Sequence, residues 1–156
     1  MDHIAYIGIG SNLGDRRKNC ILAIEAIGKS ESLRVEAVSK WRETQALTLG
    51  GEEGLPYVNG AAKIATNLSP HGLLKALKDI ECRMGRDEKH QRWSPRPIDL
   101  DILFYDDLVL DENGLAIPHS EIPKRLFVLE PLCDMEPKLL HPVLKATVLE
   151  LHRRIA

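Results

Sequence analysis

The order of two kinds of apolar segment constrains the fold of this 156-residue chain most strongly. Apolar residues that alternate, or that run together for a few positions, indicate β-strands, whereas apolar residues recurring every three to four positions indicate helices. The order strand, helix, strand, strand, helix, strand predicts a ferredoxin-like βαββαβ sandwich of the α+β class, an antiparallel sheet with both helices on one face. The predicted segments are 4–10, 15–27, 33–44, 57–66, 70–84 and 98–105.

The residues after position 105 predict smaller elements that form a C-terminal extension of the same single domain, residues 1–156. Pro131, Pro137 and Pro142 indicate irregular chain between them, because proline interrupts helices. The predicted elements are a hairpin of strands 108–110 and 115–117 around Asp111-Glu112-Asn113-Gly114, a helical turn at 122–125 and a closing helix at 147–154.

The last main strand carries two aspartates, Asp99 and Asp101, two positions apart. Side chains alternate between the faces of a strand, so both carboxylates lie on one face with α-carbons roughly 6.5–7 Å apart. That spacing lets both carboxylates bind a pair of divalent ions about 3.5–4 Å apart. The residues expected on the opposite, core face are Ile98, Leu100, Ile102 and Phe104.

Charge is divided by sign on either side of this strand. Residues 83–96 hold five Lys or Arg against two acidic residues, whereas residues 99–112 hold six acidic residues and no Lys or Arg. Carboxylates that bind metal beside guanidinium groups suit a polyphosphate ligand. A bare D-x-D motif is more often an edge strand with solvent-facing aspartates, but the segment Arg92-Trp93-Ser94-Pro95-Arg96 favours the phosphate site.

Bulk composition excludes several classes of protein. Apolar residues make up 44% and charged residues 28%, as in soluble globular proteins, and the net charge of −2 gives no field that attracts nucleic acid or membrane. Cys20, Cys82 and Cys133 are far apart, which favours a reducing compartment and argues against structural zinc. No segment approaches ~18 continuous apolar residues. We therefore expect a cytoplasmic protein without a membrane or nucleic-acid partner.

Three glycines near the start of the chain, Gly8, Gly10 and Gly14, invite comparison with nucleotide-binding loops. The dinucleotide motif G-x-G-x-x-G would need glycine at Leu13, and the lysine of a phosphate-binding G-x-x-x-x-G-K-[ST] loop is absent. We interpret these glycines as strand and turn residues.

Two long loops, 45–56 and 86–97, are expected to overhang the sheet face that carries Asp99 and Asp101. The first is rich in glycine and has the length of an active-site lid, although a disordered connector fits its composition equally well. The second holds most of the basic residues. We predict that both are mobile in the free protein and become ordered over a nucleotide.

The segment R-W-S-P-R-P-I-D-L-D-I-L-F at 92–104 resembles the R-W-G-P-R-x-x-D-L-D signature of the 6-hydroxymethyl-7,8-dihydropterin pyrophosphokinases, with Ser94 where glycine is usual. This segment is specific, and the resemblance extends along nearly the whole chain. The other matching pieces are A-Y-I-G-I-G-S-N-L-G-D at 5–15, E-T at 43–44, Y-V-N at 57–59, I-P-H at 117–119 and R-L-F-V-L-E-P-L at 125–132.

The resemblance implies a folate-pathway enzyme that transfers pyrophosphate from ATP to the hydroxymethyl oxygen of the pterin and leaves AMP. We expect the protein to be a monomer. ATP and the pterin would be its small-molecule partners, and two Mg²⁺ ions its cofactors. The resemblance assigns Asp99 and Asp101 to the metal ions, Arg86 and Arg96 to the transferring phosphates, Thr44, Tyr57, Asn59 and Phe127 to the pterin, and Glu81, Lys89, Trp93, Ile102, His119 and Arg125 to the nucleotide.

Plainer interpretations of these residues, and two rival functions, stay open at this point. Aromatic residues are more often core residues, exposed arginines are often only solvated, and a helix glutamate often pairs along its helix. A nucleotidyltransferase also combines G-S with D-x-D, but within a short distance in sequence, whereas Ser11 and Asp99 are far apart. An RNA-binding module of this fold would need strand aromatics and a basic face. The positions that depart from the family pattern, all on the nucleotide side, are Glu88, Gly114 and Ser120.

Overall fold

The computed structural model describes residues 1–44, 56–85 and 97–156. In this part of the chain, five strands form an antiparallel sheet in the order β2-β4-β1-β5, with β3 also pairing with β4. The elements of this unit are β1 His3–Ser11, α1 Arg16–Lys29, β2 Leu33–Val38, β3 Arg42–Thr44, β4 Tyr57–Thr66, α2 Pro70–Arg83 and β5 Asp99–Tyr105.

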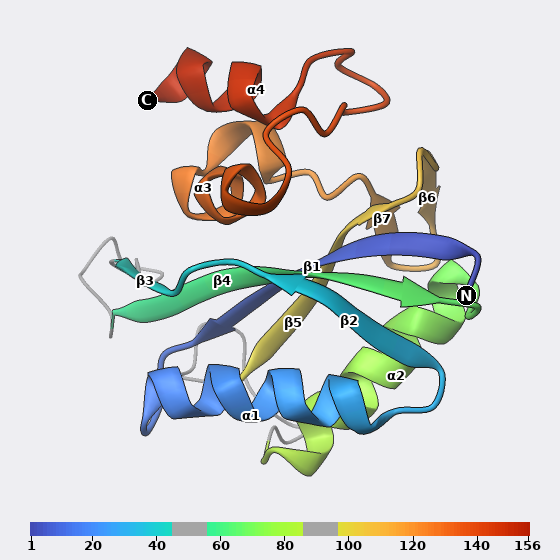
Figure 1. The fold of residues 1–156 in the computed structure, drawn as a ribbon, viewed down its shortest axis with the longest axis vertical. Coiled ribbons are helices and arrows are strands. Elements are labelled where there is room, and N and C mark those ends of the chain that lie inside the picture. Colours follow the sequence, from blue (N-terminus) through green and yellow to red (C-terminus); the bar gives the residue numbers. More distant parts are fainter. Residues whose placement is uncertain (45–55, 86–96) are drawn as a thin grey trace.

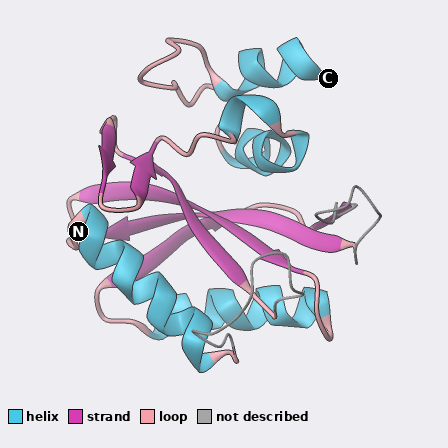
Figure 2. Cartoon of the chain, turned by 180° about the vertical axis from the view of Figure 1, so that it is seen from behind, coloured by secondary structure: helices cyan, strands magenta, loops and turns pink. Residues whose placement is uncertain are grey.

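The sheet lies between two helical layers (Figure 1, Figure 2). Helices α1 and α2 cover one face, and β1 lies between β4 and β5, so the predicted α+β ferredoxin-like fold is confirmed. The opposite face, on which the prediction places neither of the two main helices, is partly covered by α3 (Leu126–Met135) and α4 (Val148–Ile155). No helix within the described ranges is long and apolar enough to cross a membrane.

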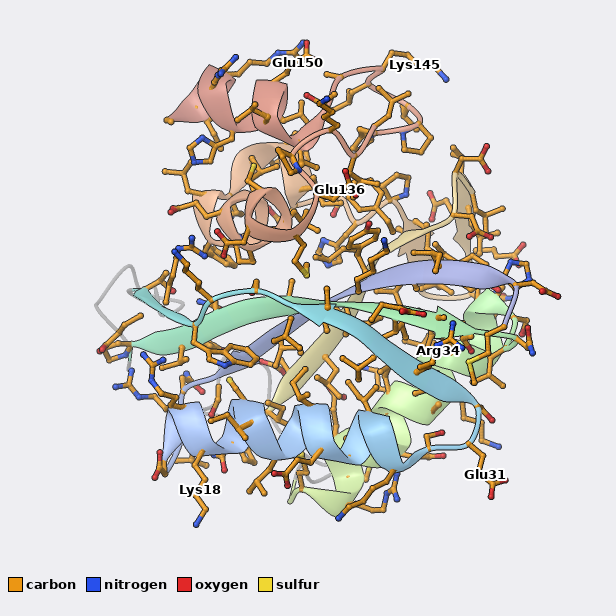
Figure 3. The ribbon with its side chains drawn as sticks, viewed as in Figure 1. Lys18, Glu31, Arg34, Glu136, Lys145 and Glu150 are labelled. Atoms are coloured by element: carbon orange, nitrogen blue, oxygen red, sulfur yellow. The ribbon has the colours of Figure 1, made fainter. Side chains whose placement is uncertain are left out.

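Two apolar cores follow from this arrangement, and side chains fill the space on both sides of the sheet (Figure 3). The first core lies under α1 and α2, whose apolar residues pack against the sheet. The second lies under α3 and α4. In the first core, the helix residues that pack against the sheet are Cys20, Ala23, Ile27, Leu73, Leu77 and Ile80. In the second core, the strand residues Tyr6, Leu103 and Phe104 pack with Leu129, Leu132, Val148 and Leu151.

Local signals determine the ends of α2, close to the predicted bounds 70–84, and the turn of the small hairpin, whose first strand lies at 110–112 rather than at the predicted 108–110. The Ser69 hydroxyl accepts a hydrogen bond from the Gly72 N–H at 3.1 Å, and Gly85 follows the helix with φ +102°. Strands β6 (Leu110–Glu112) and β7 (Leu115–Ile117) form the hairpin, whose turn residues Asn113 and Gly114 both have positive φ. The first helix, predicted over 15–27, extends to Lys29 and includes Gly28.

The strand predicted over 33–44 is interrupted, because its residues pair with β4 in two separate stretches. Val38 pairs with Ala62 and Arg42 pairs with Asn59, which leaves residues 39–41 to pass Gly60 and Ala61. A side chain at Gly60 would overlap the Trp41 ring, so glycine there lets the ring pack on the strand. The break separates β2 from β3, and β3 carries Thr44.

The prediction that Phe104 shares a face with Ile98, Leu100 and Ile102 is wrong. Strand β1 pairs Tyr6 with Phe104 and Ile7 with Ile102, so β5 holds one extra residue, Leu103. An extra residue in one strand inverts the alternation beyond it. Phe104 therefore packs in the second core, under α3 and α4.

The prediction of irregular chain from Pro131 onward is also wrong at its start, because Pro131 lies inside α3. Proline removes the hydrogen bond that its nitrogen would donate to the carbonyl of Phe127. Burial of Leu129, Pro131 and Leu132 holds the helix against the sheet despite that loss. Tertiary packing outweighs local propensity here.

Candidate active site

The predicted metal-binding aspartates lie on the sheet face that α3 and α4 cover only in part. Asp99 pairs with Gly10 of β1 and Asp101 pairs with Gly8, and directly paired residues of antiparallel strands share a face. Asp99 is half-buried and Asp101 is exposed. Both carboxylates therefore lie beside a stretch of β1 that has no side chains on this face.

Because Gly8 and Gly10 have no side chains, nothing projects from β1 in the middle of this face. A Cβ at Gly10 would lie 2.8 Å from Oδ1 of Asn59 and 3.4 Å from Cδ1 of Tyr57, so these two side chains lie across β1. A Cβ at Gly8 would lie 3.3 Å from the Leu103 side chain. The sequence interpretation as strand residues is confirmed, but it missed their role in the site. The missing signal was glycine at alternate positions of a strand, since such glycines share a face.

Asn59, Thr44 and Tyr57 form the far side of the same row. Tyr57 begins β4 and pairs with Thr44 of β3, while Asn59 pairs with Gly10. The Asn59 amide nitrogen donates a hydrogen bond to the Thr44 hydroxyl. This bond directs the amide oxygen of Asn59 over Gly10, where it is an acceptor for a ligand N–H group. Three of the four predicted pterin contacts are thus brought together.

The fourth predicted pterin contact, Phe127, lies on α3. This helix packs against β4, and the Phe127 side chain stays 40% exposed. Arg42 of β3 holds the helix by two hydrogen bonds of 2.7 Å to Asp134. The hydrogen bond from the Arg42 guanidinium lowers the pKa of the Asp134 carboxyl, which favours the ionised form of the pair. Phe127 therefore belongs to a helix fixed to the strand that carries Thr44.

His119 lies at the outer edge of β5, after the cis peptide bond between Ile117 and Pro118. Its backbone N–H donates to the Leu103 carbonyl at 3.0 Å, and its ring Nδ1 accepts from the Glu121 N–H at 3.1 Å. Because Nδ1 accepts, the neutral ring carries its proton on Nε2 and offers a donor to a ligand. Arg125 is half-exposed and pairs with Glu121 at 3.2 Å.

Glu81 of α2 is 1% exposed and contacts β5 directly between the two aspartates. Its carboxylate accepts a hydrogen bond of 2.7 Å from the Leu100 N–H, at the outer edge of the sheet. Lys78 lies 3.4 Å from its other oxygen. The contact fixes the backbone between Asp99 and Asp101. Sequence reasoning assigned Glu81 to the nucleotide and did not predict this role.

The side chain of Ile102, also assigned to the nucleotide, is 3% exposed and packs in the first core. A nucleotide contact by Ile102 is therefore left to its backbone. Four predicted site residues lie outside the described residues, namely Arg86, Lys89, Trp93 and Arg96. Almost all positions of the two predicted loops also lie outside them.

The sequence pattern of the family described as 7,8-dihydro-6-hydroxymethylpterin-pyrophosphokinase matches residues 6–137. The chain belongs to this family. The resemblance noted in the 92–104 signature is thus confirmed, and the match includes every residue of the row from Asn59 across Gly10 to Asp99.

Relatives of this chain include proteins of similar length and much longer ones. The 2-amino-4-hydroxy-6-hydroxymethyldihydropteridine pyrophosphokinase of Aquifex aeolicus is 38% identical, over 93% of this chain and 88% of that protein. The Bifunctional protein FolKE of Lactococcus lactis is 40% identical over 85% of this chain, which spans only 37% of that protein's length. A crystal structure of a Plasmodium falciparum HPPK-DHPS triple mutant has the same fold, with a TM-score of 0.78 at 18% identity, over 97% of this chain and 44% of that one.

Proposed function

We propose that this chain transfers the pyrophosphoryl group of ATP to the hydroxymethyl oxygen of 6-hydroxymethyl-7,8-dihydropterin in folate biosynthesis, giving AMP and the pterin diphosphate. The row of Asn59, Gly10 and Asp99 carries this proposal, because all three lie on one sheet face. A flat heterocycle over Gly10 would present its substituent to phosphates held beside Asp99. Membership of the pyrophosphokinase family supports the same reaction.

In this reaction the hydroxyl oxygen of the pterin forms a bond to the β-phosphorus of ATP. The bond from that phosphorus to the oxygen bridging to the α-phosphorus breaks, AMP leaves with that oxygen, and the hydroxyl proton is released. Phosphoryl transfer needs little covalent chemistry from a protein, so positioning and electrostatic stabilisation supply most of the catalysis.

We propose Asp99 and Asp101 as the ligands of two Mg²⁺ ions. Mg²⁺ is usually held by one or two carboxylates together with substrate phosphates and waters, and two neighbouring carboxylates opposite glycines fit that pattern. Among the described residues no group of three or more acidic, His or Cys side chains could hold a metal, so phosphate oxygens would complete the coordination. When bound, the ions offset charge on the non-bridging phosphate oxygens.

The pterin would bind between Tyr57 and Phe127, since a flat ring needs apolar faces on both sides. The Asn59 amide oxygen over Gly10 would accept from the edge of the ring, and the hydrogen bond from Asn59 to Thr44 holds that amide in place. A buried hydrogen-bonding edge discriminates strongly against rings that cannot pair with it.

The other assigned residues would serve ATP. His119 offers its Nε2–H, and Arg125 is half-exposed close to it in sequence. Arg86 and Arg96 would bind the transferring phosphates, because guanidinium groups form forked hydrogen bonds to phosphate oxygens. The remaining proposed nucleotide contacts are Glu81, Lys89, Trp93 and Ile102.

Incubation with Mg-ATP and hydroxymethyldihydropterin tests the function, with the products separated by chromatography. We expect AMP and pterin diphosphate in equal amounts, and no AMP when the pterin is left out. Release of inorganic pyrophosphate with nucleotide attached to the acceptor would instead identify a nucleotidyltransferase. Absence of turnover with the pterin would overturn the proposal.

We further propose that residues 1–156 form one domain that acts as a monomer in the cytoplasm. Cys20, Cys82 and Cys133 are all free, which supports a reducing compartment. Sedimentation equilibrium should give a mass close to 17.5 kDa, and a dimer mass would contradict the monomer.

A further inference from the structure

The ion pair between Arg42 and Asp134 joins two elements that are otherwise held in different ways. Arg42 Nη1 and Nη2 donate to the two carboxylate oxygens of Asp134, each at 2.7 Å, and Arg42 Nε lies 3.5 Å from Glu130. The Lys40 N–H adds a hydrogen bond of 3.2 Å to Asp134. A forked guanidinium–carboxylate pair fixes both distance and orientation, which a single charge does not.

Each partner of this ion pair lies on an element that carries a proposed pterin contact. Arg42 begins β3, and Thr44 ends it. Asp134 lies in the last turn of α3, and Phe127 lies in the first. The ion pair therefore connects the hydrogen-bonding side of the proposed pterin site to its second aromatic ring.

The first turn of α3 has little local support of its own. Its cap residue, Arg125, forms no side-chain capping hydrogen bond to the described residues of the helix. Pro131 cannot donate the backbone hydrogen bond that the Phe127 carbonyl would otherwise accept. The position of Phe127 therefore depends on how the body of α3 is docked, that is, on the apolar contacts of Leu129 and Leu132 and on the ion pair with Arg42.

We propose that Arg42 is a positioning residue for the pterin, which sets Phe127 against Tyr57, Asn59 and Thr44 without touching either substrate. This inference rests on the proposed function and names a residue that determines the fit of its acceptor. The Arg42 side chain is 29% exposed and that of Asp134 is 19% exposed, so water screens this pair less than a pair on the open surface. Arg42 lies on β3, which is separated from β5 by β4 and β1, whereas ATP would bind near β5.

Steady-state kinetics of Arg42→Met test the proposal, with each substrate varied at saturation of the other. We expect the KM for the pterin to rise about tenfold or more, because a displacement of order 1 Å in a binding site can cost far more than that. The KM for ATP should change less than about twofold, since a residue that acts only on the acceptor site does not affect nucleotide binding. Arg42→Lys should restore part of the pterin affinity, because it keeps the charge but not the fork.

Two further variants separate positioning from general loss of stability. Asp134→Asn should raise the pterin KM like Arg42→Met, and the double variant should be no worse than either, as expected for partners in one interaction. Arg34→Met is the matched control, because Arg34 forms an ion pair with Glu36 on β2, toward the end of the sheet away from β3 (Figure 3). It should leave both KM values unchanged.

The outcomes are distinct from those of the proposed function. If the wild-type chain does not form the pterin diphosphate, the function itself is wrong. If it does, and soluble Asp134→Asn or Arg42→Met keeps the wild-type pterin KM, or raises both KM values equally, the positioning role is overturned. If Arg42→Met does not fold, Asp134→Asn alone decides the comparison, because this substitution keeps the size of the side chain.

Discussion

The two faces of the sheet divide stability and chemistry between them. The face under α1 and α2 is filled by fully buried apolar side chains from both helices and from β1, β4 and β5. Among the described strand residues, the face under α3 and α4 is apolar around Tyr6, Ala61, Leu103 and Phe104, and toward the other end it carries Gly8, Gly10 and the two aspartates. The difference indicates that the first face provides the stability that allows the second to hold repelling carboxylates and strand glycines.

The largest effect that would sharpen this comparison concerns Asp99 and Asp101. Replacing either with Asn keeps its size but removes a charge that we propose binds Mg²⁺. The turnover rate should fall at least ~10²–10³-fold, as when one electrostatic stabiliser of a transition state is lost. Stability should barely change, or should rise, because repulsion between the carboxylates is relieved. Rate as a function of Mg²⁺ concentration and thermal unfolding measure the two effects.

Asp107→Asn is the matched control for these variants. Asp107 is exposed in the turn after β5 and belongs to the same acidic region. Its rate and its magnesium requirement should match those of the wild type. Near-normal rates of Asp99→Asn and Asp101→Asn at limiting Mg²⁺ would show that this face does not bind the metal.

The opposite face should show the reverse pattern when Leu77 is changed to Ala. Leu77 is fully buried in α2 and packs in the first core. Its truncation should lower the free energy of unfolding by about 2–5 kcal/mol and leave the turnover number of the folded protein within about twofold. Denaturant titration and kinetics at low temperature measure these quantities. Lys75→Ala, at an exposed position of α2, should change stability by less than about 0.5 kcal/mol. A large fall in turnover of folded Leu77→Ala would contradict the division between faces.

The regular part of the fold could be predicted because apolar residues recur with a fixed period on one face of each main helix and strand. The period of the apolar residues identified α1, α2, β1, β4 and β5, and Ser69 and Gly85 marked the ends of α2. The bulge at Leu103 could not be predicted, since it depends on how β5 pairs with Tyr6 and Ile7. Helix α3 was missed because the local cost of Pro131 is outweighed by burial that only the complete fold provides.

The site was predicted from a motif, and the geometry around the motif was not. The row of Asn59, Gly10 and Asp99 depends on the register of three strands that are far apart in sequence. The bond from Leu100 to Glu81 likewise requires α2 and β5 to be placed together. Sequence reasoning thus found residue types whose chemistry suits phosphates and pterin. The contacts between elements that hold these residues in place were seen only in the structure.

Gly10→Ala should affect both stability and binding, because Gly10 lies in a central strand directly beside Asn59, on the face where we propose that the pterin binds. The new methyl group would lie 2.8 Å from Oδ1 of Asn59, too close for any real contact, so Asn59 or the strand must move. We expect a loss of stability of about 1–3 kcal/mol and a weaker pterin affinity, with nucleotide affinity unchanged. Thermal unfolding and calorimetry with each ligand separate these effects.

Gly28→Ala is the control for the added methyl group. Gly28 lies in α1, and a Cβ added there would have no other atom within 4 Å. The substitution should therefore raise stability by up to about 1 kcal/mol and leave binding unchanged. If Gly10→Ala binds the pterin as well as the wild type does, the pterin does not lie over Gly10.

The smallest effect concerns His141, which lies beside Phe104 in the region under α4. Its ring is 6% exposed, and Nδ1 accepts hydrogen bonds from the N–H groups of Val143 and Leu144 at 3.2 and 3.1 Å. Burial lowers the pKa of His141 below its ordinary value of 6.5. The unfolded chain therefore binds the proton more readily than the folded one, and protonation would also remove the acceptor at Nδ1.

The contribution of His141 to stability is fully present above pH 6.5 and is lost as the pH falls from there through the folded-state pKa. The loss amounts to about 1.4 kcal/mol for each unit by which folding lowers that pKa. Urea titrations between pH 8 and pH 5 should show a steeper fall for the wild type than for His141→Asn, whose amide oxygen can accept from the same N–H groups without titrating. The other histidines contribute equally to the pH dependence of both proteins, so their contribution cancels in the difference. Equal slopes would show that His141 does not link pH to the stability of this face.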